Sequence, residues 1–322
     1  MDWLLTGSNL IHDTIVFSTA LIFAALGGLY SERSGVVNIA LEGMMIIGAF
    51  TGAVVTFFVQ PFFPSPSTVA PWIGFFAAIV VGAIFALPHA VASITFKADQ
   101  VVSGVALNFL AAGLSVYLTK IIFNGAGQTT TLSTVFSKWH IPLLGDIPYL
   151  GHALFEGYPT SYLAFALVAI TWYVLFRTPF GLRLRAVGEH PRAADTVGIN
   201  VKRMRYTAVI ISGALAAMGG ATIALTTTSN FSHNTVSGQG FIALAALIFG
   251  KWNPGGVMWA ALFFGIAQAI KSLVQIYGLT AYVPIEVIYM LPYILTILVL
   301  AGVVGRTNAP AAAGKPYETG SR

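Results

Sequence analysis

The chain consists mostly of long apolar segments separated by short polar stretches. A helix needs about 20 apolar residues to cross the hydrocarbon core of a bilayer, which is about 30 Å thick. Eight segments come close to that length, and they cover residues 12–30, 36–59, 69–96, 101–123, 161–177, 206–228, 256–276 and 283–304. The pattern therefore predicts an all-α polytopic membrane protein.

A further apolar piece, residues 241–250, is shorter and is followed by Lys251, Trp252, Asn253 and Pro254. At the rise of an α-helix it reaches only about 15 Å, half of the hydrocarbon core. It is either a half-helix or a full span that also includes the polar residues before it. A backbone break at membrane depth persists only where it is buried in protein or lines a cavity. We therefore expect about 8–10 transmembrane helices, one of them broken.

The composition excludes several classes of protein. Only 8% of the residues are charged and 57% are hydrophobic. Soluble domains carry about 25% charged residues, and disordered chains combine low hydrophobicity with high net charge. The chain has no cysteine, which excludes disulfides and thiolate metal sites. Its six histidines lack the spacing of a zinc enzyme, so we expect neither a metal nor a cofactor.

The positive charges predict the orientation of the chain in the membrane. Cytoplasmic loops carry an excess of Lys and Arg, and the loop over 177–205 holds seven of the sixteen basic residues. If this loop is cytoplasmic, alternation of the spans places all but Lys120, Lys138 and Lys271 on the same side. The C-terminus is then cytoplasmic. The positive net charge reflects membrane orientation, and we expect no binding to nucleic acid.

We expect residues 1–322 to form a single transmembrane domain with two organised loops. The external loop, 124–160, contains prolines and glycines with apolar residues between them. It is long enough to fold over the outer mouth or to contact an external partner. The inner loop, 178–205, and a tail, 305–322, are predicted to be cytoplasmic.

The inner loop contains the signals of a short helix. Pro191 suits the first turn of a helix, and Gly198 suits a left-handed stop. Between them Ala193, Ala194 and Val197 form a small apolar face. Such a face suits insertion into a cleft of another protein. The alternative is a solvated amphipathic linker that its arginines hold at the membrane, and the residues alone do not decide between the two.

Four stretches of the sequence resemble a known family. Residues 188–199, with paired alanines and a glycine four residues later, resemble the coupling loop of bacterial ABC importer permeases. The stretch 32–45, Glu-Arg-Ser-Gly-Val-Val-Asn-Ile-Ala-Leu-Glu-Gly-Met-Met, resembles the signature of the branched-chain amino-acid, ribose and nucleoside permease family. Residues 98–108 and 240–256 are similar to further motifs of that family. The likeness is greatest to its nucleoside and simple-sugar members.

The resemblance implies a type II ABC importer permease in the bacterial cytoplasmic membrane. Such a subunit pairs with a second permease, here expected to be a different homologue, and with two cytoplasmic ATP-binding subunits and an external substrate-binding protein. The expected function is to provide the path for nucleosides, while a partner hydrolyses ATP. A ribose-type sugar permease is the first alternative, and an ion-coupled secondary transporter is the second. The residues implied to couple to the ATPase are Glu189, Pro191, Arg192, Ala193, Ala194, Val197 and Gly198.

The residues agree with this division of labour, because the chain lacks the pattern of a nucleotide site. The nearest approach to a phosphate-binding loop is Gly265 with Lys271 and Ser272, but Ile270 stands where the second glycine is needed. Residues 238–243 mimic a dinucleotide fingerprint but lack the βαβ setting. Energy must therefore come from a partner or from an ion gradient.

Polar residues at membrane depth are candidates for the substrate pathway. Glu42 lies about 9 Å inside a span that begins near Val36. A carboxylate there costs roughly 2.5–3.5 kcal/mol on insertion scales, so it is expected to face protein or water. Asn38 is predicted on the same helical face, and the pair suits hydrogen bonding to a hydroxylated substrate. Alternatively, Glu42 pairs with a backbone amide or a basic residue and braces a broken helix.

Two other helical faces are polar. One follows positions 108, 112, 115 and 119, and the other follows positions 268, 271 and 275. Lys271 lies near an outer end, where its ammonium can instead reach the membrane interface. The candidate pathway residues are Asn38, Glu42, Asn108, Ser115 and Gln268.

Overall fold

The computed structural model describes residues 3–63, 68–142, 144–276 and 309–318, together with Val287, Met290, Ile294 and Ile297. Within these residues seven helices are long and apolar enough to cross a membrane, and the chain is a multi-pass membrane protein. They are α1 (Trp3–Arg33), α2 (Leu41–Val59), α3 (Val69–Phe85), α5 (Gln100–Ile122), α6 (Pro159–Arg177), α9 (Val201–Thr222) and α11 (Pro254–Ile276). They match the first seven predicted spans. The eighth, 283–304, lies outside the described residues apart from the four isolated positions.

Shorter elements complete the fold. Helix α3 is followed by α4 (Leu87–Ala90) and a π-helical turn η2 (Val91–Thr95), and α9 continues into the π-helical turn η4 (Ile223–Thr227). The predicted half-helix is present as α10 (Gln239–Phe249). The remaining elements are η1 (Gln60–Phe62), η3 (Gly151–Phe155), α7 (Pro179–Glu189), α8 (Pro191–Thr196) and the antiparallel strands β1 (Trp139–His140) and β2 (Glu156–Gly157).

Polar side chains fix where several helices begin. The carboxylate of Asp99 accepts hydrogen bonds from the amides of Val101 and Val102 at the start of α5. Thr178 caps α7 and Asn200 caps α9 in the same way. Each cap satisfies amides that have no partner within their helix, and its loss typically costs about 1 kcal/mol.

Helix α2 begins at Leu41, whereas the apolar pattern predicts a span from residue 36. The preceding residues do not continue the helix, because their backbone groups have partners elsewhere. The amide of Val37 donates to Oε1 of Gln100 at 2.7 Å, and the amide of Ala40 donates to Oδ1 of Asn38 at 3.0 Å. Glu42 therefore lies in the first turn of α2 rather than deep within a longer helix.

The core is built around α9, which packs against α1 and against α2 along much of their lengths. Glycines allow α2 and α9 to come close together. A Cβ at Gly48 would overlap the backbone of Ala217, and a Cβ at Gly220 would overlap the carbonyl of Met45. Close approach through small residues is a common basis of helix packing in membranes, where apolar burial gives little drive for association.

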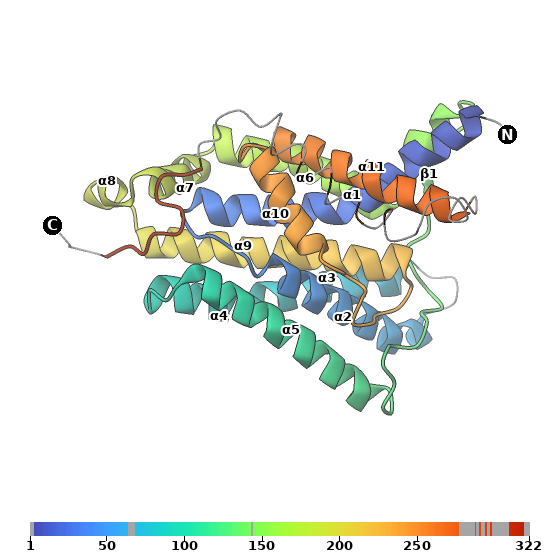
Figure 1. Ribbon diagram of the computed structural model, residues 1–322, viewed down its shortest axis with the longest axis horizontal. Helices are drawn as coiled ribbons and strands as arrows, with labels where there is room; N and C mark the ends of the chain where they lie inside the picture. The colour runs from blue at the N-terminus through green and yellow to red at the C-terminus, as the bar shows by residue number, and fades with distance from the viewer. Residues whose placement is uncertain are drawn as a thin grey trace.

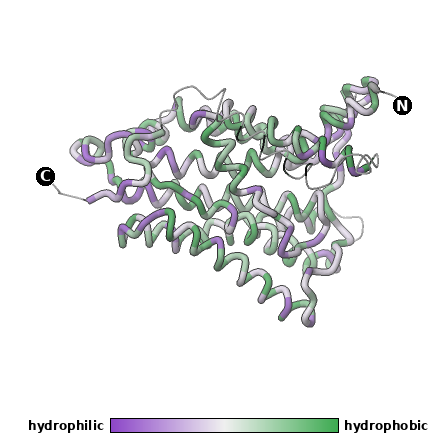
Figure 2. The backbone as a smooth tube through the Cα atoms, in the orientation of Figure 1, coloured by the Kyte–Doolittle hydropathy of each residue, from purple (hydrophilic) through white to green (hydrophobic). Residues whose placement is uncertain are grey.

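The long helices run mainly along the long axis of the molecule, and α10 crosses them near the middle (Figure 1). Helices α7 and α8 and the described part of the tail lie at one end, while the start of α1 and β1 lie at the opposite end (Figure 1). Figure 2 shows hydrophilic residues gathered around α7, α8 and the tail, whereas hydrophobic residues prevail along the long helices. The fold thus separates the polar end that holds α7, α8 and the tail from an apolar middle.

Candidate functional site

The segment between α1 and α2 is a meeting point for several helices. The carbonyl of Val37 lies 3.1 Å from Nε2 of His89 in α4, and Nδ1 of His89 lies 2.9 Å from Oγ of Ser103 in α5. Together with the bond from the Val37 amide to Gln100, these contacts fix a non-helical segment against α4 and α5. These contacts were not predicted from the sequence. The available signal was the presence of two polar residues, His89 and Gln100, beside apolar segments.

Asn38 is fully buried in this segment. Its Nδ2 donates to Oγ of Ser212 in α9 at 2.8 Å, while its Oδ1 accepts from the amide of Ala40. The prediction that Asn38 and Glu42 share one helical face is wrong, because Asn38 precedes α2 and is not helical. Its side chain joins the segment to α9.

Glu42 binds the start of the half-helix α10. Its Oε1 accepts from the amide of Gly238 and its Oε2 from the amide of Gly240, each at 2.7 Å. A carboxylate at a helix N-terminus satisfies free amides and interacts favourably with the helix dipole. A Cβ at Gly240 would overlap the Cα of Glu42, so only glycine fits there. These are the contacts expected if Glu42 pairs with backbone amides and braces a broken helix. A role of Glu42 in the substrate pathway remains a prediction.

The other end of α10 is held by the end of α1. The indole Nε1 of Trp252 donates to Oε2 of Glu32 at 2.5 Å. The guanidinium of Arg33 donates to the carbonyl of Trp252 through Nε at 3.0 Å and Nη2 at 2.6 Å. Both ends of the half-helix are therefore bonded to the stretch 32–42, within the motif that carries the family resemblance.

Asn108 of α5 connects to the same place. Its Oδ1 accepts from the amide of Gly43 at 2.7 Å, and its Nδ2 donates to the carbonyl of Ile39 at 3.0 Å. The structure thus brings together three candidate residues, Asn38, Glu42 and Asn108, around the start of α2. All three form hydrogen bonds within the protein.

The remaining pathway candidates lie elsewhere. Ser115 is buried and donates to the carbonyl of Ala112 within its own helix at 3.1 Å. Ala112 itself is exposed, so the predicted polar face of α5 is split between a buried and an exposed side. Gln268 in α11 has an inaccessible Nε2 with no hydrogen-bond partner within the described residues. Neither residue has a described hydrogen bond to the cluster around Glu42.

The predicted short helix of the inner loop is present as α8. Pro191 is its first residue, and Gly198 follows it in the left-handed region with φ of +83°. Val197 is 74% exposed and Ala193 is also exposed, whereas Ala194 is only 4% exposed. The prediction of one shared apolar face is therefore wrong, because adjacent helical positions point about 100° apart. Ala194 faces the protein and its neighbours face outward.

Two grooves flank α8. One, of about 910 Å³, lies between the ends of α7 and α9 and is lined in part by Leu182, Arg183, Val197 and Arg203. The other, of about 600 Å³, lies between α8 and the tail residues 311–318. The surface around α8 therefore combines exposed apolar side chains with arginines and recesses.

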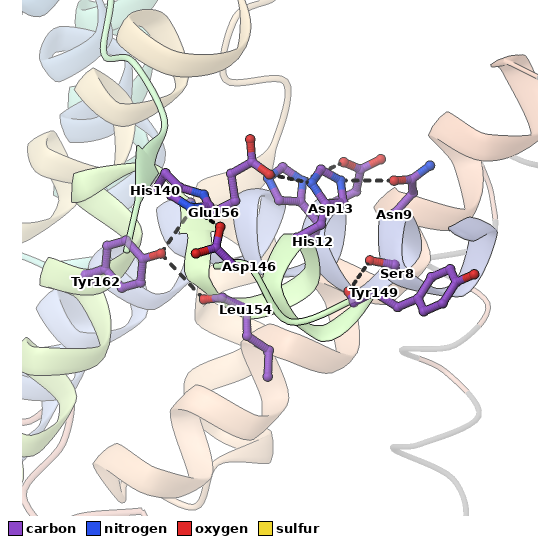
Figure 3. A network of polar contacts seen from close by, with 12 residues as sticks. Ser8, Asn9, His12, Asp13, His140, Asp146, Tyr149, Leu154, Glu156 and Tyr162 are labelled. Carbon is purple, nitrogen blue, oxygen red and sulfur yellow. Dashed lines mark hydrogen bonds and ion pairs between the residues drawn. The ribbon is translucent and has the colours of Figure 1, made fainter. Parts of the chain in front are cut away.

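The opposite end of the molecule carries an ordered polar network (Figure 3). His152 lies between two oxygens, with Nδ1 at 2.9 Å from Oε2 of Glu156 and Nε2 at 3.0 Å from Oδ1 of Asn9. Its ring stacks on His12 of α1 with 5.0 Å between centroids. The hydrogen bond from His152 lowers the pKa of Glu156. Residues 139–157 are thus attached to the start of α1.

Comparison with known proteins identifies relatives along the whole chain. Residues 10–300 match the family described as "Branched-chain amino acid transport system / permease component". The chain is 52% identical to the guanosine ABC transporter permease protein NupQ of Bacillus subtilis, over 100% of both chains. It is 42% identical to the nucleoside ABC transporter permease protein NupC of Lactococcus lactis, over 96% of each chain.

A relative from Haloferax volcanii is named for another substrate. The chain is 36% identical to the putative glucose ABC transporter permease protein TsgC13 of Haloferax volcanii, over 82% of this chain and 77% of that protein. The expected family and fold class are thereby confirmed. The chain belongs to the permease-component family of branched-chain amino acid transport systems, and it is an ABC transporter permease, a transport subunit that works in a complex rather than as an enzyme.

Proposed function

We propose that the chain is the membrane-spanning permease of an ATP-driven importer for nucleosides. The observation that carries the proposal is the full-length identity of 52% to a protein named as a guanosine permease. The relative named for nucleosides supports the same substrate class at 42% identity. A simple-sugar permease is the second candidate, favoured by the 36% identity to a putative glucose permease.

The proposed assembly has a second permease, which we expect to be a different homologue, two cytoplasmic ATP-binding subunits and an external substrate-binding protein. We place it in the bacterial cytoplasmic membrane. Residues 178–205 and the C-terminal tail, 305–322, would face the cytoplasm, and residues 124–160 would face outward. The excess of positive charge in the first of these segments supports this orientation.

Helix α8 is the proposed contact with the ATPase. The proposed contact residues are Glu189, Pro191, Arg192, Ala193, Val197 and Gly198, and Ala194 supports them from beneath. The exposure of Val197 and the grooves on both sides of α8 support this role. ATP binding would draw the two ATPases together and move α8.

The proposed movement reaches the middle of the membrane through packed contacts. Gly188 at the end of α7 lies against the carbonyl of Arg33, where a Cβ would overlap it. Arg33 is bonded to Trp252 beyond the end of α10, and Glu42, nine positions later in the same stretch, is bonded to the start of α10. We propose that displacement of α10 changes which side of the membrane the path faces. A substrate shifts the equilibrium between the outward-facing and inward-facing states only by binding them unequally. Weak binding of the substrate to the path is therefore sufficient for transport.

We propose that Asn38, Glu42 and Asn108 shape the path by holding its helices, while Ser115 and Gln268 lie along it. The hydrogen bonds of the first three within the protein support that division. Specificity is expected to lie mainly in the external binding protein.

Uptake by the reconstituted assembly tests the proposed function. We expect ATP-dependent accumulation of labelled purine or pyrimidine nucleosides, with labelled ribose excluded. Ribose uptake, with a cognate binding protein that retains pentose and no nucleoside, would establish the sugar permease instead. Uptake by this chain alone, driven by a proton or sodium gradient, would contradict both candidates.

Orientation is tested separately in intact cells. The chain has no native cysteine, so single cysteines can be labelled without background. We expect Ala126→Cys to react with a membrane-impermeant maleimide and Val197→Cys to react only after permeabilisation. The reverse pattern would overturn the proposed coupling role of α8.

A further inference from the structure

The tail residues 309–318, the C-terminal strap, pack across the end of the molecule that holds α7 and α8 (Figure 1). Ala312 and Tyr317 are 5% and 8% exposed. The amide of Ala312 donates to the carbonyl of Gly188 at 2.9 Å, and the amide of Gly314 donates to the carbonyl of Gly35 at 3.2 Å. The strap therefore joins the end of α7 to the segment between α1 and α2.

Arg205 of α9 fastens the strap from beneath. It is only 1% exposed. Its Nε donates to the carbonyl of Ser34 at 3.2 Å, and its Nη1 donates to the carbonyl of Lys315 at 3.0 Å. Burial of a guanidinium is costly unless it is hydrogen-bonded. Because its two carbonyl partners come from different segments, Arg205 holds the strap and the α1–α2 segment together on α9.

Tyr317 joins the strap to α8. Its ring packs with Val187 of α7, Ala194 of α8 and Val201 of α9. Its hydroxyl is hydrogen-bonded to Asp195 of α8. A six-residue helix is too short to be stable on its own, so α8 depends on this small cluster. Tyr317 is the member of the cluster that comes from the strap.

Force on α8 therefore has a route that does not pass along α7. It runs through Tyr317 into the strap, and from the strap through Gly314 and Arg205 to the α1–α2 segment and α9. We propose that the C-terminal strap is a coupling element, with Tyr317 and Arg205 as positioning residues that carry the movement of α8 to the α1–α2 segment. This inference rests on the proposed contact between α8 and the ATPase.

The test compares nucleosides transported with ATP hydrolysed in the same reconstituted assembly. For Tyr317→Ala, and for a chain that ends at Ala309, we expect the ATPases to stay bound and active while nucleosides moved per ATP fall at least fivefold. Tyr317→Phe, which loses only the bond to Asp195, should give a smaller fall, and Arg205→Met a fall like that of Tyr317→Ala. Lys120→Gln is the control, because Lys120 is exposed in the last turn of α5 and lines neither groove beside α8.

A chemical rescue separates coupling from folding. In Tyr317→Cys combined with Asp195→Cys, we expect low transport per ATP before treatment and recovery after a short bismaleimide links the strap to α8. An unchanged ratio in Tyr317→Ala and the truncated chain would overturn the inference. So would a parallel loss of hydrolysis and uptake with no rescue, because that is a purely structural effect. Absence of ATP-dependent uptake by the wild-type assembly would instead contradict the proposed function.

Discussion

The carboxylate of Glu42 and the amide of Gly240 are joined by a hydrogen bond of 2.7 Å between the first turns of α2 and α10. The other carboxylate oxygen binds the amide of Gly238. Since the stretch that contains Glu42 also holds Trp252 beyond the far end of α10, the half-helix is clamped from both sides.

Replacing Glu42 with Gln should weaken the clamp. The amide side chain has one acceptor oxygen, and its NH₂ group would face the second backbone N–H. Leaving a buried donor unsatisfied costs about 1–3 kcal/mol. We expect Glu42→Gln to lower the melting temperature of the purified permease and to reduce uptake, while Lys120→Gln at the exposed end of α5 changes neither. An unchanged melting temperature would mean that Glu42 does not brace α10.

Gly240→Ala should be damaging because its Cβ would overlap the Cα of Glu42. Relief of such overlap in a packed core typically costs about 1–3 kcal/mol. Gly113→Ala is the matched control, since a Cβ there would have no neighbour within 4 Å. We expect thermal unfolding to show a lower melting temperature for the first variant and an equal or higher one for the second. Equal melting temperatures for the two variants would contradict the close approach of α2 and α10.

The adjacent alanines of α8 should respond differently to enlargement. Ala193 is exposed, so Ala193→Trp should leave permease stability unchanged but prevent co-purification of the ATPase. Ala194 is buried against Val187 and Tyr317, so Ala194→Trp should lower the melting temperature of the permease itself. Ala126→Trp on the opposite end serves as the control. If Ala193→Trp binds the ATPase as the wild type does, α8 is not the docking element.

The contact between His152 and Glu156 should depend on acid pH. Because this hydrogen bond lowers the pKa of Glu156, it favours the ionised carboxylate of the folded protein. The contribution is complete above the ordinary Glu pKa of about 4.3 and is lost as the pH falls through the lower folded value. Protection of the amides over 151–157 from exchange, relative to their intrinsic exchange rates, should therefore fall below about pH 4 in the wild type. Glu156→Gln should lack that acid step, and an identical step in the variant would exclude this pair as its cause.

The apolar pattern was sufficient to predict the helices but not how the polar segments fold. Val36, Val37 and Ile39 resemble the start of a span, yet their segment is not helical. The reason is that Gln100, 63 positions further along the chain, accepts the hydrogen bond of the Val37 amide. Such a partner has no local signature. The half-helix was predictable because polar residues follow a run too short to cross the membrane.

The candidate site was also predicted only in part. Asn38, Glu42 and Asn108 stood out because polar side chains are costly in apolar segments, and the structure brings them together. Their partners are mostly backbone groups, which sequence patterns do not distinguish. The packing of Tyr317 was not predicted, because one aromatic residue in a polar tail has no periodicity.

The clamp on α10 also constrains how the protein is assembled in the membrane. Glu42 precedes Gly238 by 196 positions, so α1 and α2 are synthesised long before α10, the helix that they hold. At about 16 Å for its eleven residues, α10 is too short to be integrated as an independent span. It must instead pack against a surface formed by helices that were synthesised earlier. The order of synthesis, from N- to C-terminus, thus supplies the scaffold before the piece that needs it.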